Sequence, residues 1–121
     1  MSRKCVYIAG PLSSPTCTGY LQNVHRFYSA QVALIRHGFA PFNPAADLTV
    51  GIMAGDMEYE DYFGPNFAWL EKADAVLMLS SSPGADRECE RARELGIPVL
   101  DSVEGLIEYF AGEWIDELPG D

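Results

Sequence analysis

The chain has 121 residues, and its 18 Asp and Glu residues outnumber its 8 Lys and Arg residues, which gives a net charge of −10. That length suits one domain over residues 1–121, and an apolar share of 48% is enough to build a core. The negative field opposes binding to phosphate backbones and anionic lipid, so we expect no nucleic-acid partner and no membrane partner. A small anionic substrate stays compatible, because a few backbone amides can outweigh a distant field.

The sequence also indicates a cytoplasmic protein, and we expect no cofactor and no metal. No stretch approaches the roughly 18 consecutive apolar residues of a membrane span, and residues 1–4 lead into a short apolar run rather than a signal peptide. Cys5, Cys17 and Cys89 are odd in number and widely spaced. This pattern indicates reduced thiols rather than a disulfide framework or a zinc site.

Two strands and a helix are predicted in the first part of the chain. The apolar run 6–10 ends in glycine before a proline and predicts a buried strand. Apolar residues mostly three, four or seven apart predict a helix over 20–37, which Gly38 closes. Residues 39–42 predict a second strand. Residues 45–62 are the least regular part of the chain and are predicted to be irregular and rich in loops.

The second part continues the alternation of strands and helices. Trp69 is predicted to lie in the core, on a helix. The predicted elements are a helix over 66–72, a strand over 75–79, a helix over 85–95, a strand over 97–100, a helix over 103–110 and a frayed tail over 110–121.

This order predicts an α/β fold, a single flavodoxin-like or Rossmann-like domain with a four- to five-stranded parallel sheet and helices on both faces. Ligands of such sheets bind outside the carboxyl ends of the strands. Those ends fall at residues 9–10, 42–43, 80–84 and 101–102. A functional site is therefore expected where these segments meet.

Glu88 stands out on the predicted helix 85–95. It lies three residues after Ala85, four before Ala92 and seven before Leu95, which places it on or beside the inward face. Burying an unpaired charge is costly, so a functional interpretation is a nucleophile or a general base. The alternative is an acid of the first turns that the helix dipole stabilises and water partly reaches.

Other polar residues near the strand ends allow two interpretations each. Serines 80–82 before a helix suit an anion such as phosphate, or simply cap the helix. Tyr7 is a core tyrosine or a catalytic phenol, and Asn43 is a turn residue or a ligand-binding side chain. The acids within 56–61 form a solvated face, in which a pocket acid can also lie.

Taken together, four segments resemble the nucleoside 2-deoxyribosyltransferase superfamily over about residues 6–99. The fourth is the most specific: a glycine, a glutamate four residues later, an alanine four residues after that, and a Gly-x-Pro-Val ending. The segments are 6–12, 38–44, 69–76 and 82–88, the last followed by Ala92 and 96–99.

The resemblance implies that Glu88 is a nucleophile that attacks the anomeric carbon of a (deoxy)ribose and displaces the base. Tyr7 matches the first-strand tyrosine that lies close to that glutamate in the superfamily. In chemical terms this is the logic of a retaining glycosidase, in which a covalent glycosyl-enzyme forms and is then resolved. A second group must protonate or hydrogen-bond the leaving base.

The residue six positions before the nucleophile distinguishes the branches of this superfamily. Transferases carry an aspartate there, whereas the nucleotide hydrolases carry a serine that binds the 5′-phosphate. In this chain the residue at that position is Ser82. The sequence therefore looks more like the nucleoside 5′-monophosphate N-hydrolases. We expect Gly10, Asn43 and Gly84 to bind substrate as well.

The acid that the superfamily carries three residues before the helix tryptophan is Asn66 in this chain. Asp61 and Asp56 are the candidates to assist the leaving base instead, and Asp61 is the closer in sequence. The superfamily also builds its pockets with a neighbouring subunit, which implies a homodimer or higher homo-oligomer. Ser102 is the candidate for a phosphate ligand from that neighbour.

Three other functions compete with nucleotide hydrolysis. A nucleoside deoxyribosyltransferase would pass the sugar to a second base, and a non-catalytic nucleotide-binding module would keep the pocket without the chemistry. A flavodoxin-like flavin binder would use the loop 16–19, but residues 11–15 separate that loop from the first strand.

Overall fold

Strands and helices alternate along the computed structural model, which describes residues 2–117 and the side chains of residues 2–112. The elements are β1 (Cys5–Ala9), α1 (Cys17–Arg36), β2 (Ala40–Phe42), the short 3-10 helix η1 (Pro44–Ala46), α2 (Asp47–Ala54), α3 (Tyr59–Leu70), β3 (Ala75–Met78), α4 (Pro83–Glu94), β4 (Val99–Leu100) and α5 (Val103–Glu117).

Over the described residues, the four strands form one parallel sheet in the order β2-β1-β3-β4. Val6 pairs with Pro41 of β2 on one side and with Ala75 of β3 on the other. The chain passes from β1 to β2 on one side and then returns to β3 on the opposite side. The carboxyl ends of β1 and β3 therefore form the switch point at which such sheets bind ligands, and the predicted α/β fold is confirmed.

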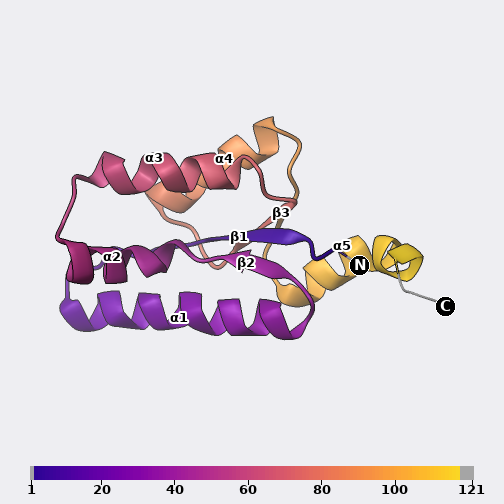
Figure 1. The fold of residues 1–121 in the computed structure, drawn as a ribbon, viewed down its shortest axis with the longest axis horizontal. Coiled ribbons are helices and arrows are strands. Elements are labelled where there is room, and N and C mark those ends of the chain that lie inside the picture. Colours follow the sequence, from indigo (N-terminus) through magenta and orange to yellow (C-terminus); the bar gives the residue numbers. More distant parts are fainter. Residues whose placement is uncertain (1, 118–121) are drawn as a thin grey trace.

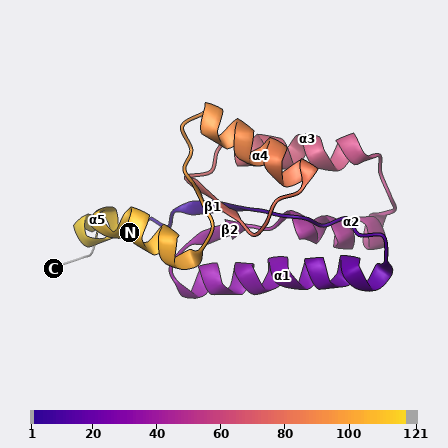
Figure 2. The same cartoon turned by 180° about the vertical axis from the view of Figure 1, so that it is seen from behind.

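Alternating side chains of β1 serve two hydrophobic cores, one on each face of the sheet. Val6 and Ile8 are buried against α1 and α5, whereas Tyr7 and Ala9 are buried against α3 and α4. Figures 1 and 2 show α1 along one face of the sheet and the pair α3 and α4 along the other. The second core reaches Glu88 through its neighbours on α4, Ala85 and Cys89.

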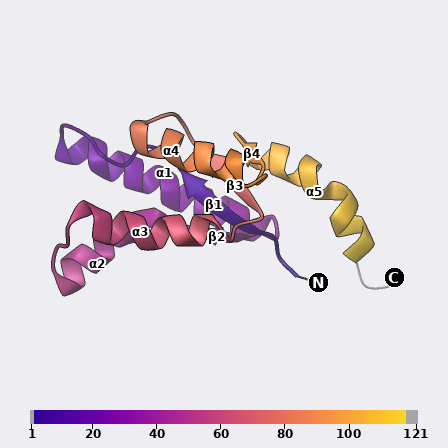
Figure 3. The ribbon, with the colours of Figure 1, turned by 90° about the horizontal axis from the view of Figure 1, so that it is seen from above.

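The two ends of the molecule differ. Helix α2 lies at the end where the ligand-binding edge of the sheet is, and α5 extends away at the opposite end (Figure 3). The N-terminus lies near α5, where the Lys4 ammonium stands 5.6 Å from the centre of the Phe110 ring. Function is therefore expected at the end formed by α2.

The sequence prediction was wrong for residues 45–62, which are mostly helical. Helix α3 begins at Tyr59, seven residues before the predicted start at 66, and continues through Pro65. A capping box starts it, because Glu58 and Asp61 each accept from the other's backbone N–H. Gly64 and Pro65 disfavour a helix locally, but packing of its apolar face outweighs this preference.

Trp69 was predicted to lie in the core, and this is also wrong. Its side chain is 58% exposed, and its ring stacks on Phe42 with 5.9 Å between centroids. Leu70, the next residue, faces the core instead. The other predicted elements shift by at most three residues, except that α5 continues to Glu117 rather than ending at 110. Of the tail predicted to fray, residues 118–121 lie outside the described residues.

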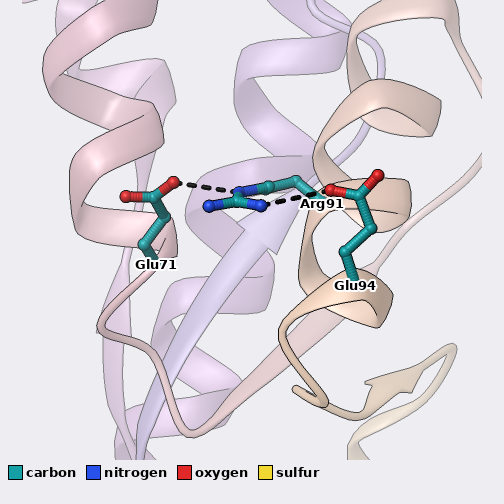
Figure 4. A network of polar contacts seen from close by, with 3 residues as sticks. All are labelled: Glu71, Arg91 and Glu94. Atoms are coloured by element: carbon teal, nitrogen blue, oxygen red, sulfur yellow. Dashed lines mark hydrogen bonds and ion pairs between the residues drawn. The ribbon is translucent and has the colours of Figure 1, made fainter.

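A polar network on the surface connects α3 to α4, the two helices of one face (Figure 4). Arg91 donates from Nε to Glu71 at 3.0 Å and from a terminal nitrogen to Glu94 at 3.2 Å. All three side chains are solvent-accessible, so the network orients the helices more than it stabilises them.

Candidate active site

A cleft of about 920 Å³ opens at the carboxyl edge of the sheet. This volume falls within the range of roughly 300–1,000 Å³ that small-molecule sites have. Its walls come from the loop after β1 (10–13), α1 (Tyr20, Phe27), η1 and α2 (Pro44, Asp47, Leu48, Gly51, Ile52), Asp56 and α3 (Tyr59, Tyr62, Phe63, Asn66), and the start of α4 (82–85, Glu88).

Glu88 reaches this cleft from the second turn of α4. Its side chain is 8% exposed, and it is the one buried charged residue among those described. Burial raises its pKa to about 7, although the hydrogen bond from Tyr7 and the charge of Arg87 act in the lowering direction. The carboxylate is therefore a desolvated group that changes its charge near neutral pH, which suits a nucleophile or a general base.

Tyr7 holds that carboxylate. Its hydroxyl donates a hydrogen bond to Oε2 of Glu88, and its ring stacks on Phe42 with 5.4 Å between centroids. Burial raises the pKa of Tyr7, and the charge of Glu88 raises it further, so the phenol stays a neutral donor. The pair joins the carboxyl half of β1 to α4 and fixes the direction of the Glu88 side chain.

The N-terminus of α4 forms the polar end of the cleft. Ser82 caps the helix by accepting from the Ala85 amide at 3.1 Å, and Pro83 at the first helical position suits the helix start. Gly84 leaves open space, since the nearest atom to an added Cβ would be the Tyr59 hydroxyl at 4.0 Å. The Gly84 amide and the positive end of the helix make this a surface that suits an anion.

The other two serines of this loop face elsewhere. Ser81 donates to the Asp86 carboxylate at 2.8 Å, and Ser80 accepts from Arg26 at 3.2 Å. Ser82 is thus the serine of the run 80–82 that lines the cleft. This matches the residue that the sequence singled out.

Helices α2 and α3 build the wall of the cleft that lies across from α4 and Glu88. Asn66 donates to the Asp47 carboxylate at 2.6 Å. Tyr59 and Phe63 stack with 5.5 Å between centroids, and the Arg87 guanidinium lies 4.4 Å from the Phe63 ring centre. This wall therefore combines aromatic surface with one oriented carboxylate.

The structure brings together most of the residues that the sequence predicted. Gly10, Ser82, Gly84 and Glu88 line the same cleft, and Tyr7 contacts Glu88 behind it. A Cβ added at Gly10 would stand 3.1 Å from the Leu79 side chain, so the backbone at Gly10 passes close to Leu79 as the chain leaves β1. Segments that are distant in the sequence thus meet at the carboxyl edge of the sheet, where parallel α/β sheets bind their ligands.

Three predicted residues lie elsewhere. Asn43 caps η1 through the Ala45 amide at 2.8 Å and donates to Gln31, outside the cleft lining. The exposed Asp61 accepts from the Glu58 amide at 3.3 Å and belongs to the cap of α3. Ser102 accepts from the Gly105 amide at 2.9 Å and caps α5.

Sequence reasoning missed Asp47 and the cleft phenols Tyr20, Tyr59 and Tyr62. Asp47, Tyr59 and Tyr62 lie on the two helices that the sequence did not predict, whereas Tyr20 lies on the predicted first helix. Burial, followed by the charge of Asp47, raises the pKa of Tyr20. Over residues 2–112, no group of three His, Cys, Asp or Glu side chains is placed to hold a metal ion, and Cys5, Cys17 and Cys89 are free thiols.

Comparison with known families gives one match. The model described as "Domain of unknown function (DUF4406)" covers residues 4–101, which include β1, both walls of the cleft and all of α4. No curated protein matches the chain. No described helix is both long and apolar enough to span a membrane.

Proposed function

The chain belongs to the family described as Domain of unknown function (DUF4406), and for this member we propose hydrolysis of the N-glycosidic bond of a (deoxy)nucleoside 5′-monophosphate. The products are the free base and the sugar phosphate. The observation that carries the proposal is the buried Glu88 carboxylate, which Tyr7 holds beside a cleft that the N-terminus of α4 also lines.

Glu88 is the proposed nucleophile. Its carboxylate attacks C1′ of the sugar while the bond to the base breaks through an oxocarbenium-like transition state. The resulting glycosyl ester is then hydrolysed by water, which restores the carboxylate. Tyr7 supports this chemistry because a neutral donor holds Oε2, while Oε1 has no hydrogen-bond partner among the described residues.

The proposed 5′-phosphate site is the N-terminus of α4. The Ser82 hydroxyl and the Gly84 amide are donors, and the helix dipole favours an anion there. These local groups act at contact distance, so they outweigh the net charge of −10. Ser82 also favours hydrolysis over transfer, because the transferases that the sequence resembles carry an aspartate at this position.

The test is a screen of nucleoside 5′-monophosphates, with bases and products separated by chromatography. We expect one class of nucleotide to yield free base and sugar phosphate in equal amounts. A new nucleoside formed only when a second base is added would identify a transferase instead. Tight nucleotide binding without any base release would identify a non-catalytic module.

Replacing Tyr7 with phenylalanine is expected to move the pH dependence of base release upward. Base release by an ionised nucleophile rises as pH increases through the pKa of Glu88, which is about 7. The Tyr7 hydrogen bond lowers that pKa, so its loss raises the midpoint. The measurement is kcat/KM between pH 5 and 9 for both proteins, with circular dichroism to verify folding. An unchanged or lower midpoint would contradict the proposed role of Tyr7.

A homodimer is also expected, with α2 at the interface. Ile52 and Met53 of this helix are 71% and 79% exposed, and exposed apolar side chains of this kind suit an interface. Light scattering should give a mass of twice 13.3 kDa, and Met53→Glu should reduce it to 13.3 kDa. A fully active monomer would contradict the shared interface and would show that α2 covers only the cleft of its own subunit.

A further inference from the structure

Departure of the base requires a proton that Glu88 cannot supply. When the C1′–N bond breaks, the electron pair stays on a nitrogen of the base, which is a poor leaving group unless it is protonated. Glu88 must be ionised, and a nucleophile attacks from the side of C1′ opposite to the base. Tyr7 already donates its hydrogen to Glu88, and burial raises its pKa. Another group on the facing wall has to hold the proton.

Two further acids line the cleft, Asp47 and Asp56. Asp56 is exposed in the connection between α2 and α3. One of its oxygens lies 2.9 Å from the place that a Cβ on Gly51 would take, so it packs against α2. Asp47 is half-buried at the first residue of α2. Its Oδ2 accepts from the Asn66 amide at 2.6 Å, which fixes the direction of the carboxylate.

Asp47 also interacts electrostatically with the hydrogen-bond partner of the nucleophile. Its charge acts on the phenol of Tyr7, the same phenol that donates to Glu88. Over the described residues, Oδ1 of Asp47 has no hydrogen-bond partner, while Oδ2 is occupied by Asn66. One oxygen is therefore held and the other is available to a ligand in the cleft.

We propose that Asp47 gives the departing base its proton and that Asn66 is the positioning residue that orients Asp47; this inference rests on the proposed function. The complex that reacts holds Glu88 ionised and a proton on Oδ1 of Asp47. In the first step Glu88 bonds to C1′, the C1′–N bond breaks, and that proton moves from Asp47 to the base nitrogen. In the second step a water occupies the place of the base. Its oxygen bonds to C1′, its proton returns to Asp47, and the bond between Glu88 and C1′ breaks. Both carboxyl groups regain their starting states, and one water has been consumed.

From one position Asp47 protonates the leaving base in the first step and accepts the proton of the water in the second. In a retaining mechanism the water approaches C1′ from the side that the base has left. The group that protonates the base is therefore the group that the incoming water meets. Because α3 carries Asn66 and α2 carries Asp47, their hydrogen bond also holds the two helices of this wall together.

The test compares Asp47→Asn with the unaltered protein on two substrates. The first is the best nucleotide from the screen. The second is an analogue whose base leaves without a proton, N7-methylated for a purine or ring-fluorinated for a pyrimidine. We expect Asp47→Asn to lower kcat on the first by roughly 100-fold or more, the range for loss of a general acid, and on the second by only a few-fold. Asn66→Ala should show the same substrate dependence with a smaller loss.

Glu60→Gln is the matched control, because this acid is exposed on the first turn of α3. It should leave both rates unchanged. Asp47→Ser provides a second variant if Asp47→Asn does not fold. Equal losses on both substrates, or no loss on either, would overturn the role of Asp47 while the proposed function stands. If the unaltered protein releases no base from any nucleotide, the proposed function itself fails and this inference fails with it.

Discussion

Glu88→Gln is expected to abolish base release and to stabilise the folded protein above pH 7. The amide keeps the shape of the side chain and can still accept from Tyr7, but it cannot form the glycosyl ester. We expect a loss of roughly 1,000-fold or more, about 4 kcal/mol of transition-state stabilisation. The measurement is base release at saturating nucleotide, together with urea unfolding at several pH values.

The stability change follows from the raised pKa of Glu88. Folding shifts this pKa from 4.5 to about 7, so the folded state binds more protons than the unfolded state between these values. The contribution of Glu88 to the free energy of unfolding is therefore fully present below pH 4.5 and is lost as the pH rises to about 7. Above that pH the buried charge costs roughly 3 kcal/mol. Glu88→Gln removes the cost, so its advantage should be present at pH 8 and absent at pH 4.

Glu90→Gln is the appropriate control, since Glu90 is exposed on the same helix. It should change neither base release nor the pH dependence of unfolding. Near-normal turnover by Glu88→Gln would exclude Glu88 as the nucleophile. A stability difference that does not depend on pH would show that Glu88 is not a buried charge in the folded protein.

The sequence predicted the sheet well because each strand is short, apolar and bounded by glycine, proline or polar residues. The edge where strand ends meet follows from topology, so Gly10, Ser82 and Gly84 could be placed there. Glu88 was recognisable because it interrupts an apolar stripe. In each case a local pattern carried the information.

Residues 45–62 could not be predicted in the same way. Gly51, Gly55 and Pro65 lower the local preference for helix, and only packing over the cleft restores it. Asp47 and Asn66 are 19 residues apart, so their hydrogen bond depends on how α2 and α3 pack. Asp61 was chosen as the acid because it is near Asn66 in sequence, but it caps α3. Distance along the chain is a poor guide where two helices meet.

Ser82→Asp is expected to remove activity on nucleoside 5′-monophosphates while leaving the fold intact. Aspartate caps helices as well as serine does and suits the positive end of α4, so stability should not fall. A carboxylate about 4 Å from a phosphate costs about 4 kcal/mol at an effective dielectric of 20. That cost corresponds to roughly 1,000-fold in kcat/KM. The measurement is kcat/KM for each nucleotide and for its unphosphorylated nucleoside.

Ser82→Ala separates phosphate binding from capping. It should weaken nucleotide use by roughly 1–3 kcal/mol, the range for a hydrogen bond to a charged group, and affect nucleosides much less. It should also cost about 1 kcal/mol of stability through the lost cap on Ala85, a cost that Ser82→Asp avoids. The pair thus varies charge and capping independently. Equal losses on nucleotides and nucleosides in both variants would assign Ser82 to the helix cap alone, and the phosphate would then have to bind elsewhere in the cleft.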